Sequence, residues 1–88
     1  MNDEKADWTR RAIDVMTAWS AARGDSRHAA RRVAAYEGDE PDGLMKLTVG
    51  FINLSAMLLV ELEGLSGSDM TTILQDVAKF TLETAPDR

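Results

Sequence analysis

The side chains that could carry out acid–base chemistry are few, and their spacing does not suit it. His28 is the only histidine, and catalysis by histidine needs a nucleophile or a carboxylate held beside it. Its near neighbours along the chain are the arginines Arg27 and Arg31. We therefore interpret His28 as part of a solvent-exposed basic surface and predict no catalytic residue.

The carboxylates and the missing cysteines also argue against a metal or cofactor site. Glu61 and Glu63 are two residues apart, so on a helix they point to different sides. Residues 39–42 form an acidic loop that lacks the ligand spacing of a calcium loop. The chain has no cysteine, which excludes a disulfide, a thiolate zinc site and a cysteine nucleophile. We predict no metal, no cofactor and no enzymatic activity.

Basic side chains cluster around one predicted turn, namely Arg23, Arg27, His28, Arg31 and Arg32. Ser20, Gly24, Ala30 and Val33 have roughly the spacing of small, turn and packing positions, so residues 17–37 resemble a degenerate DNA-binding helix-turn-helix. That resemblance implies that the second helix would aim its arginines at phosphates or guanine edges. The plainer interpretation is a solvated basic face that also balances the acidic half of the chain. In an interaction protein the same face could bind another protein.

Asn53 is the most informative polar residue, because it lies within a very apolar stretch. A buried amide must find a partner or it costs about 1–3 kcal/mol. A symmetric pairing near a two-fold axis would supply one, and Gly50 one turn earlier would allow close approach. A bond to a nearby backbone carbonyl or a water molecule is the alternative. The predicted dimer interface comprises Phe51, Asn53, Leu54, Met57 and Leu58.

Hydrophobic spacing and turn residues predict the elements that must position these groups. We expect an all-α fold with four helices, at about residues 3–23, 26–37, 43–63 and 68–84, in a single domain spanning residues 1–88. Gly24 is expected to close the first helix, and residues 39–43 form an acidic turn around a proline. Asp25 or Ser26 is predicted to cap the second helix, and Ser66 or Ser68 the fourth.

The third predicted helix is apolar around most of its circumference. One stripe comprises Leu44, Leu47, Phe51, Leu54, Leu58 and Leu62, and a second comprises Met45, Val49, Ile52, Ala56 and Leu59. Residues 47–60 contain no charged residue, but 14 residues are too few to cross a bilayer. We therefore expect a buried helix, covered in part by a second copy because an 88-residue chain has few other elements.

Composition sets the remaining limits. The apolar fraction is 44% and the net charge is −5. Residues 1–38 carry seven basic and six acidic side chains, whereas residues 39–88 carry three and nine. The N-terminus lacks the pattern of a secretory signal, which favours a cytoplasmic protein. The many alanines and arginines suggest a bacterial or phage genome.

Together these observations predict a non-enzymatic, homodimeric interaction protein that regulates another protein as an adaptor or an inhibitor. We expect it to bind a protein partner and not to bind a membrane. The first alternative is a small dimeric DNA-binding regulator that uses residues 17–37. The second is a structural or assembly component of a phage or a larger complex.

Overall fold

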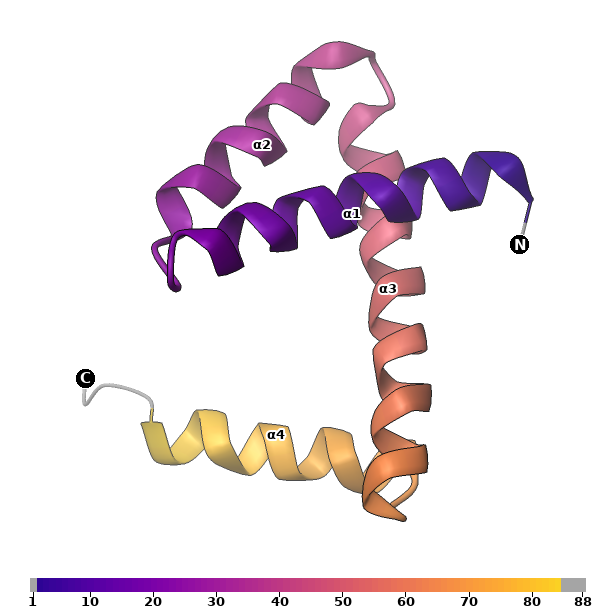
Figure 1. Cartoon of the computed structure of the whole chain (residues 1–88), viewed down its shortest axis with the longest axis vertical. Coiled ribbons are helices and arrows are strands. Elements are labelled where there is room, and N and C mark those ends of the chain that lie inside the picture. Colours follow the sequence, from indigo (N-terminus) through magenta and orange to yellow (C-terminus); the bar gives the residue numbers. More distant parts are fainter. Residues whose placement is uncertain (1, 85–88) are drawn as a thin grey trace. The chain divides into compact units, whose positions relative to one another are not determined.

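The computed structural model describes residues 2–84, and in this part of the chain all regular structure is helical (Figure 1). The helices are α1 (Asp3–Ala21), α2 (Ser26–Asp39), α3 (Gly43–Ser66) and α4 (Met70–Thr84). The prediction of an all-α fold with four helices is therefore confirmed. Helices α2 and α3 extend two or three residues further than predicted, and α4 begins two residues later.

The chain divides into two compact units, and the boundary falls inside α3. The N-terminal unit is Met1–Ser55 and the C-terminal unit is Ala56–Arg88. No turn residue marks this boundary, because α3 continues through it as one helix. Each unit is described separately below.

Short polar side chains cap three of the helices. Asn2, Asp25 and Asp69 each accept a hydrogen bond from a backbone amide in the first turn that follows, at 2.8, 3.0 and 2.8 Å. Such bonds satisfy amides that have no partner within the helix. The prediction for Asp25 is confirmed. The prediction that Ser66 or Ser68 caps α4 is wrong, because Asp69 directly precedes the first helical residue.

The link between α1 and α2 is a tight turn with two left-handed residues. The amide of Gly24 donates to the carbonyl of Trp19 at 3.1 Å, and the amide of Arg23 donates to that of Ser20 at 3.0 Å. This pair of bonds is the Schellman arrangement. Gly24 has φ +85°, as expected for a glycine at a helix end, but Arg23 also has φ +55°. A side chain in this region carries a steric cost that glycine avoids.

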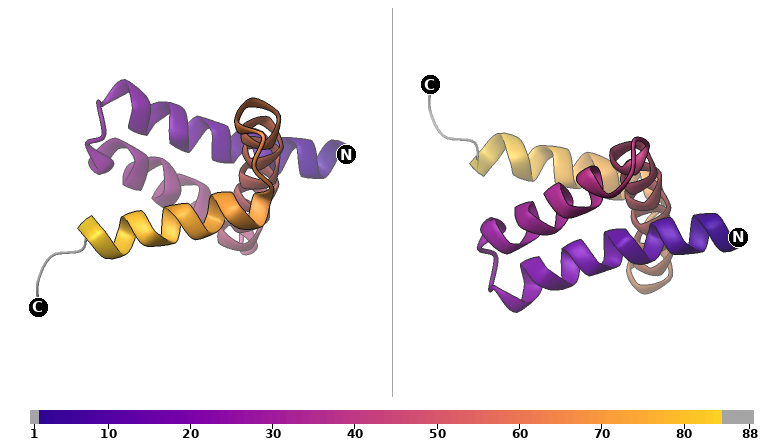
Figure 2. Two further views of the ribbon diagram at one scale, coloured as in Figure 1. Left: turned by 90° about the horizontal axis from the view of Figure 1, so that it is seen from below. Right: turned by 90° about the horizontal axis from the view of Figure 1, so that it is seen from above.

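In the N-terminal unit, α3 crosses α1 at a point where two backbones touch (Figures 1 and 2). A Cβ atom added to Gly50 would overlap the carbonyl oxygen of Trp8 and would lie 3.2 Å from the amide nitrogen of Thr9. A Cβ added to Gly43 would likewise overlap the carbonyl oxygen of Tyr36 in α2. The absence of side chains at these two glycines therefore sets how closely α3 approaches both other helices.

The core of the N-terminal unit forms around these crossings and is small. Ala12, Val15 and Leu47 are buried, and Leu47 lies between the two glycines on the same face of α3. Half-buried side chains surround this core, namely Ala29, Val33, Tyr36, Phe51 and Leu54. The buried hydroxyl of Thr9 donates to the carbonyl of Lys5 at 2.7 Å, so this polar group has a hydrogen-bond partner although it lies buried close to the crossing.

Two sequence-based expectations concern the packing of α3. Gly50 was expected to allow close approach of a neighbouring group, and the close contact in the structure is with α1 of its own chain. Helix α3 was expected to be too apolar for this chain alone to cover, and only 17% of its most apolar 18-residue stretch is buried within the chain. The reason is that α1 and α2 contact one face of α3 and leave the opposite face bare.

A single methyl group is predicted to have opposite effects on stability at Gly50 and at Gly64. Gly50→Ala should lower the free energy of unfolding by about 2–3 kcal/mol, because the helices must separate to accommodate the Cβ. Gly64→Ala is the matched control on the same helix, where a Cβ would meet no atom within 4 Å. It should raise stability by about 0.5–1 kcal/mol. Urea unfolding followed by circular dichroism measures both, and equal stabilities would contradict the crossing.

The left-handed turn predicts a stabilising substitution. Arg23→Gly removes the side chain from a left-handed residue and should raise stability by about 0.5–1 kcal/mol, or a few degrees in the thermal midpoint. Arg23→Ala removes the same charge but keeps a Cβ, so it should bring no such gain. Scanning calorimetry distinguishes them. If both variants gain equally, charge rather than backbone conformation is responsible.

Candidate interaction surfaces

The structure separates the five residues predicted for the dimer interface. Phe51 and Leu54 are half-buried and pack against the core of their own N-terminal unit. Met57 and Leu58, in the C-terminal unit, are exposed. The Nδ2 atom of Asn53 is buried and has no hydrogen-bond partner in the described chain. The predicted interface therefore remains a prediction for Asn53, Met57 and Leu58, whereas Phe51 and Leu54 already contact the core.

The second apolar stripe of α3 is largely uncovered, and Leu44, Leu58 and Leu62 of the first stripe are exposed as well. Its members follow each other at intervals of four and three residues, so they share one face, opposite Leu47 and Gly50. Met45 and Ile52 are exposed, the latter to 62%, and Val49 is half-buried. The first stripe, by contrast, supplies the buried Leu47. Sequence periodicity found both stripes but could not tell which one α1 and α2 would cover.

The C-terminal unit contains no fully buried side chain between residues 56 and 83. Its two helical segments are linked by a hydrogen bond, which the carboxylate of Glu63 accepts from the amide of Met70 at 3.1 Å. Between them Gly67 turns the chain with φ +74°. Large apolar side chains remain exposed on both helical segments, namely Met57, Leu58, Val60, Leu62, Leu65, Leu74, Val77, Phe80 and Leu82. Large apolar side chains exposed in this number leave apolar surface available for contact with another protein.

Two of the predicted basic residues are engaged within the N-terminal unit. Arg27 binds the carboxylate of Asp25 through two nitrogen atoms, at 3.0 and 2.6 Å. Arg32 binds Asp14 of α1 at 2.7 Å, and Tyr36 donates to the same carboxylate at 2.8 Å. The hydrogen bonds from Tyr36 and then from Arg32 lower the pKa of Asp14 below its usual value.

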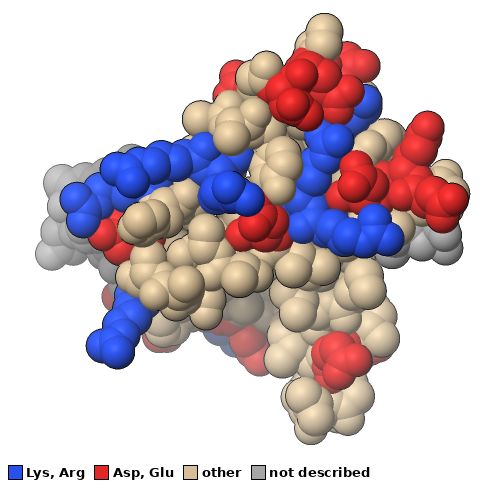
Figure 3. All heavy atoms as spheres, turned by 45° about the horizontal axis from the view of Figure 1, so that its top comes forward, with Lys and Arg blue, Asp and Glu red and all other residues tan. Residues whose placement is uncertain are grey.

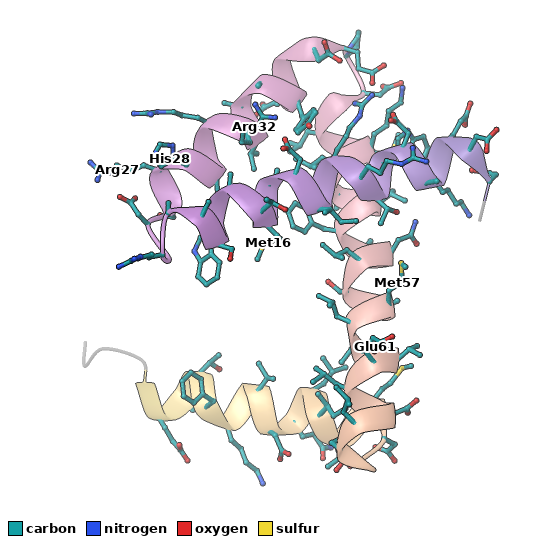
Figure 4. All side chains as sticks on the ribbon, viewed as in Figure 1. Met16, Arg27, His28, Arg32, Met57 and Glu61 are labelled. Atoms are coloured by element: carbon teal, nitrogen blue, oxygen red, sulfur yellow. The ribbon has the colours of Figure 1, made fainter. Side chains whose placement is uncertain are left out.

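The other three basic residues, Arg23, His28 and Arg31, are exposed and make no ion pair within residues 2–84. Figure 4 shows Arg27 and His28 pointing away from α1, whereas Arg32 lies between α2 and α1. In Figure 3, carboxylates are interleaved with the Lys and Arg side chains. The positive charges of Arg27 and Arg32 are therefore partly neutralised by Asp25 and Asp14 of the chain itself.

Glu40 joins the three helices of the N-terminal unit. It directly precedes Pro41 and is extended, with φ −157° and ψ 160°, which ends α2. Its two carboxylate oxygens accept from Arg11 of α1 at 3.1 Å and from Lys46 of α3 at 2.8 Å. These bonds, first that from Lys46 and then that from Arg11, lower the pKa of Glu40. The sequence placed Glu40 only within an acidic loop, because a partner 29 residues away leaves no sequence signal.

A shallow hollow of about 370 Å³ lies beside this cluster. It is lined by Asp3, Glu4, Asp7, Trp8, Arg11, Glu40 and Lys46. Asp7 also pairs with Arg11 at 3.2 Å, so much of the charge in the hollow is balanced locally. Within residues 2–84 no group of three or more His, Cys, Asp or Glu side chains could hold a metal ion.

Among the described residues one helix, α3, is long and apolar enough to cross a membrane by length and composition alone, with 24 residues and a mean hydropathy of 1.7 in its most apolar stretch. In the N-terminal unit this helix is packed against α1 and α2 through Gly43, Leu47 and Gly50. No protein-family model, curated protein or solved structure matches the chain.

The double role of Glu40 predicts a pH dependence of stability. Because its pKa is lowered in the folded state, its stabilising contribution is complete above about pH 4.5, its ordinary value, and is lost as the pH falls through the lower folded value. Glu40→Gln cannot titrate, so its thermal midpoint should decline less than that of the wild type between about pH 5 and pH 3. The neighbouring Asp39→Asn is the control and should follow the wild type. Parallel wild-type and Glu40→Gln curves would show that the bridge adds no stability.

Proposed function

We propose that this protein is a non-enzymatic helical interaction protein that acts as a homodimer and serves as an adaptor or an inhibitor of another protein. The observation that supports this most directly is the largely exposed outer face of α3, which carries Met45, Val49 and Ile52 and lies opposite Leu47 and Gly50. Ile52 and Met45 are exposed there although their side chains are large and apolar. Burying such a side chain fully contributes about 1.5–3 kcal/mol, so a second copy that covers this face gains substantial free energy.

The charge pattern of α3 suits contact between two identical copies. Residues 47–60 contain no charged residue, so two such helices can lie together without repulsion between like charges. In a two-fold interface each residue acts twice, once on each copy.

The packing of the N-terminal unit supports a soluble protein over a membrane-spanning one. A helix needs about 20 consecutive apolar residues in contact with lipid to span the hydrocarbon core. The first half of α3 is instead held against two polar-faced helices through Gly43 and Gly50.

The test compares one substitution at two exposed isoleucines. Ile52→Asn on the outer face of α3 should raise the dissociation constant of the dimer at least about twentyfold, since a two-fold interface loses the side chain twice. Ile13→Asn is the matched control, because Ile13 is also exposed, to 44%, but lies on α1. It should leave the dimer unchanged. Sedimentation equilibrium measures both. A wild-type protein that stays monomeric at high micromolar concentration would overturn the proposal.

A further inference from the structure

Helix α4 presents an amphipathic face whose edge is acidic. Met70, Ile73, Leu74 and Val77 recur at the spacing of a single apolar stripe. Leu74 and Val77 are exposed to 54% and 55%. Along one side of this stripe lie Asp69, Asp76 and Glu83, each seven residues from the next and therefore on one line along the helix.

We propose that this face of α4 binds a cationic amphipathic helix of a partner protein. This inference rests on the proposed role as an interaction protein and names the chemistry of the partner at the C-terminal unit. Apolar side chains of the partner would cover Leu74 and Val77. Lysine or arginine side chains at seven-residue intervals on the partner would pair with the three carboxylates, which are about 10 Å apart along the helix.

Charge complementarity favours such a partner over a second copy at this face. Residues 56–88 carry six acidic and two basic side chains, so the same unit from another copy would bring like charge to the acidic edge. Antiparallel pairing of two α4 helices would place the acidic edges against each other. The outer face of α3 has no charge between residues 47 and 60 and lacks this obstacle. The two faces therefore suit different occupants.

The carboxylates along this edge are available for such pairing. Asp69 accepts hydrogen bonds from the backbone amide and from the side chain of Thr72 as the cap of α4, but it makes no ion pair in the described part of the chain. Asp76 makes no ion pair in the described part of the chain, and its side chain is exposed. A partner therefore does not have to displace an existing salt bridge at Asp76 in order to bind.

The experiment measures binding of a designed 18-residue peptide helix with leucines along one face and lysines beside them. A second peptide has glutamate in place of each lysine. The full-length protein should bind the lysine peptide and not the glutamate peptide, as measured by fluorescence anisotropy at low salt. The variant D69N/D76N/E83Q should bind the lysine peptide at least about fivefold more weakly, and the difference should shrink near 1 M salt, where charges are screened beyond about 3 Å.

A matched control separates this face from general attraction between opposite charges. The variant E37Q/D39N/D42N removes the same number of carboxylates from the N-terminal unit and should bind the lysine peptide as the wild type does. Equal weakening in both variants, or equal binding of both peptides, would overturn the proposal. Leu74→Gln should weaken binding at least about fivefold in any salt, because it removes exposed apolar contact area.

Sedimentation of the same variants distinguishes a failure of this inference about α4 from a failure of the proposed homodimer. The α4 variants should remain dimers, because the proposed dimer contact lies on α3. If Leu74→Gln converts the dimer to a monomer, the occupant of this face is a second copy and the inference fails. If the wild type is monomeric yet binds the lysine peptide at α4, only the homodimer proposal fails.

Discussion

The contact between Gly50 and the backbone of Trp8 and Thr9 is the constraint on which the N-terminal unit depends. Once two helices approach this closely, only small or well-placed side chains can fill the space around the crossing. This explains why the buried core is limited to Ala12, Val15 and Leu47. The ion pairs of Glu40 and Asp14 then link the outer parts of the three helices, where apolar contact ends.

A core of this size leaves many apolar side chains uncovered, and their distribution is informative. On α3 the bare face is uncharged, whereas on α4 the bare face has an acidic edge. Burial of apolar side chains favours binding at either face. The electrostatic free energy of bringing a charged partner to the face, however, differs between α3 and α4. Surfaces that differ in this way can select different partners without any difference in helix architecture.

The sequence predicted the four helices well, because periodicity and turn residues are local signals. Asp25 as a cap and Gly24 as a left-handed residue followed from the same local chemistry. Local signals could not place Glu40 between Arg11 and Lys46, nor show that Gly50 faces α1, since both facts depend on contacts between distant segments. For the same reason the two stripes of α3 were visible, whereas their assignment to inside and outside was not. The cap at Asp69 could have been found, because it directly precedes an apolar periodic stretch.

The position of the unit boundary inside α3 has a consequence for how the helix forms. Starting a helix in isolation is unfavourable, because several residues must be ordered before the first hydrogen bond forms. In α3 the residues before the boundary are already held by the glycine crossings, so the residues after it only extend an existing helix. Each added residue then gains one hydrogen bond for one ordered backbone unit. The part of α3 that is packed in the N-terminal unit thus provides the first helical turns for the part in the C-terminal unit. That exposed apolar segment can therefore be helical without a bound partner.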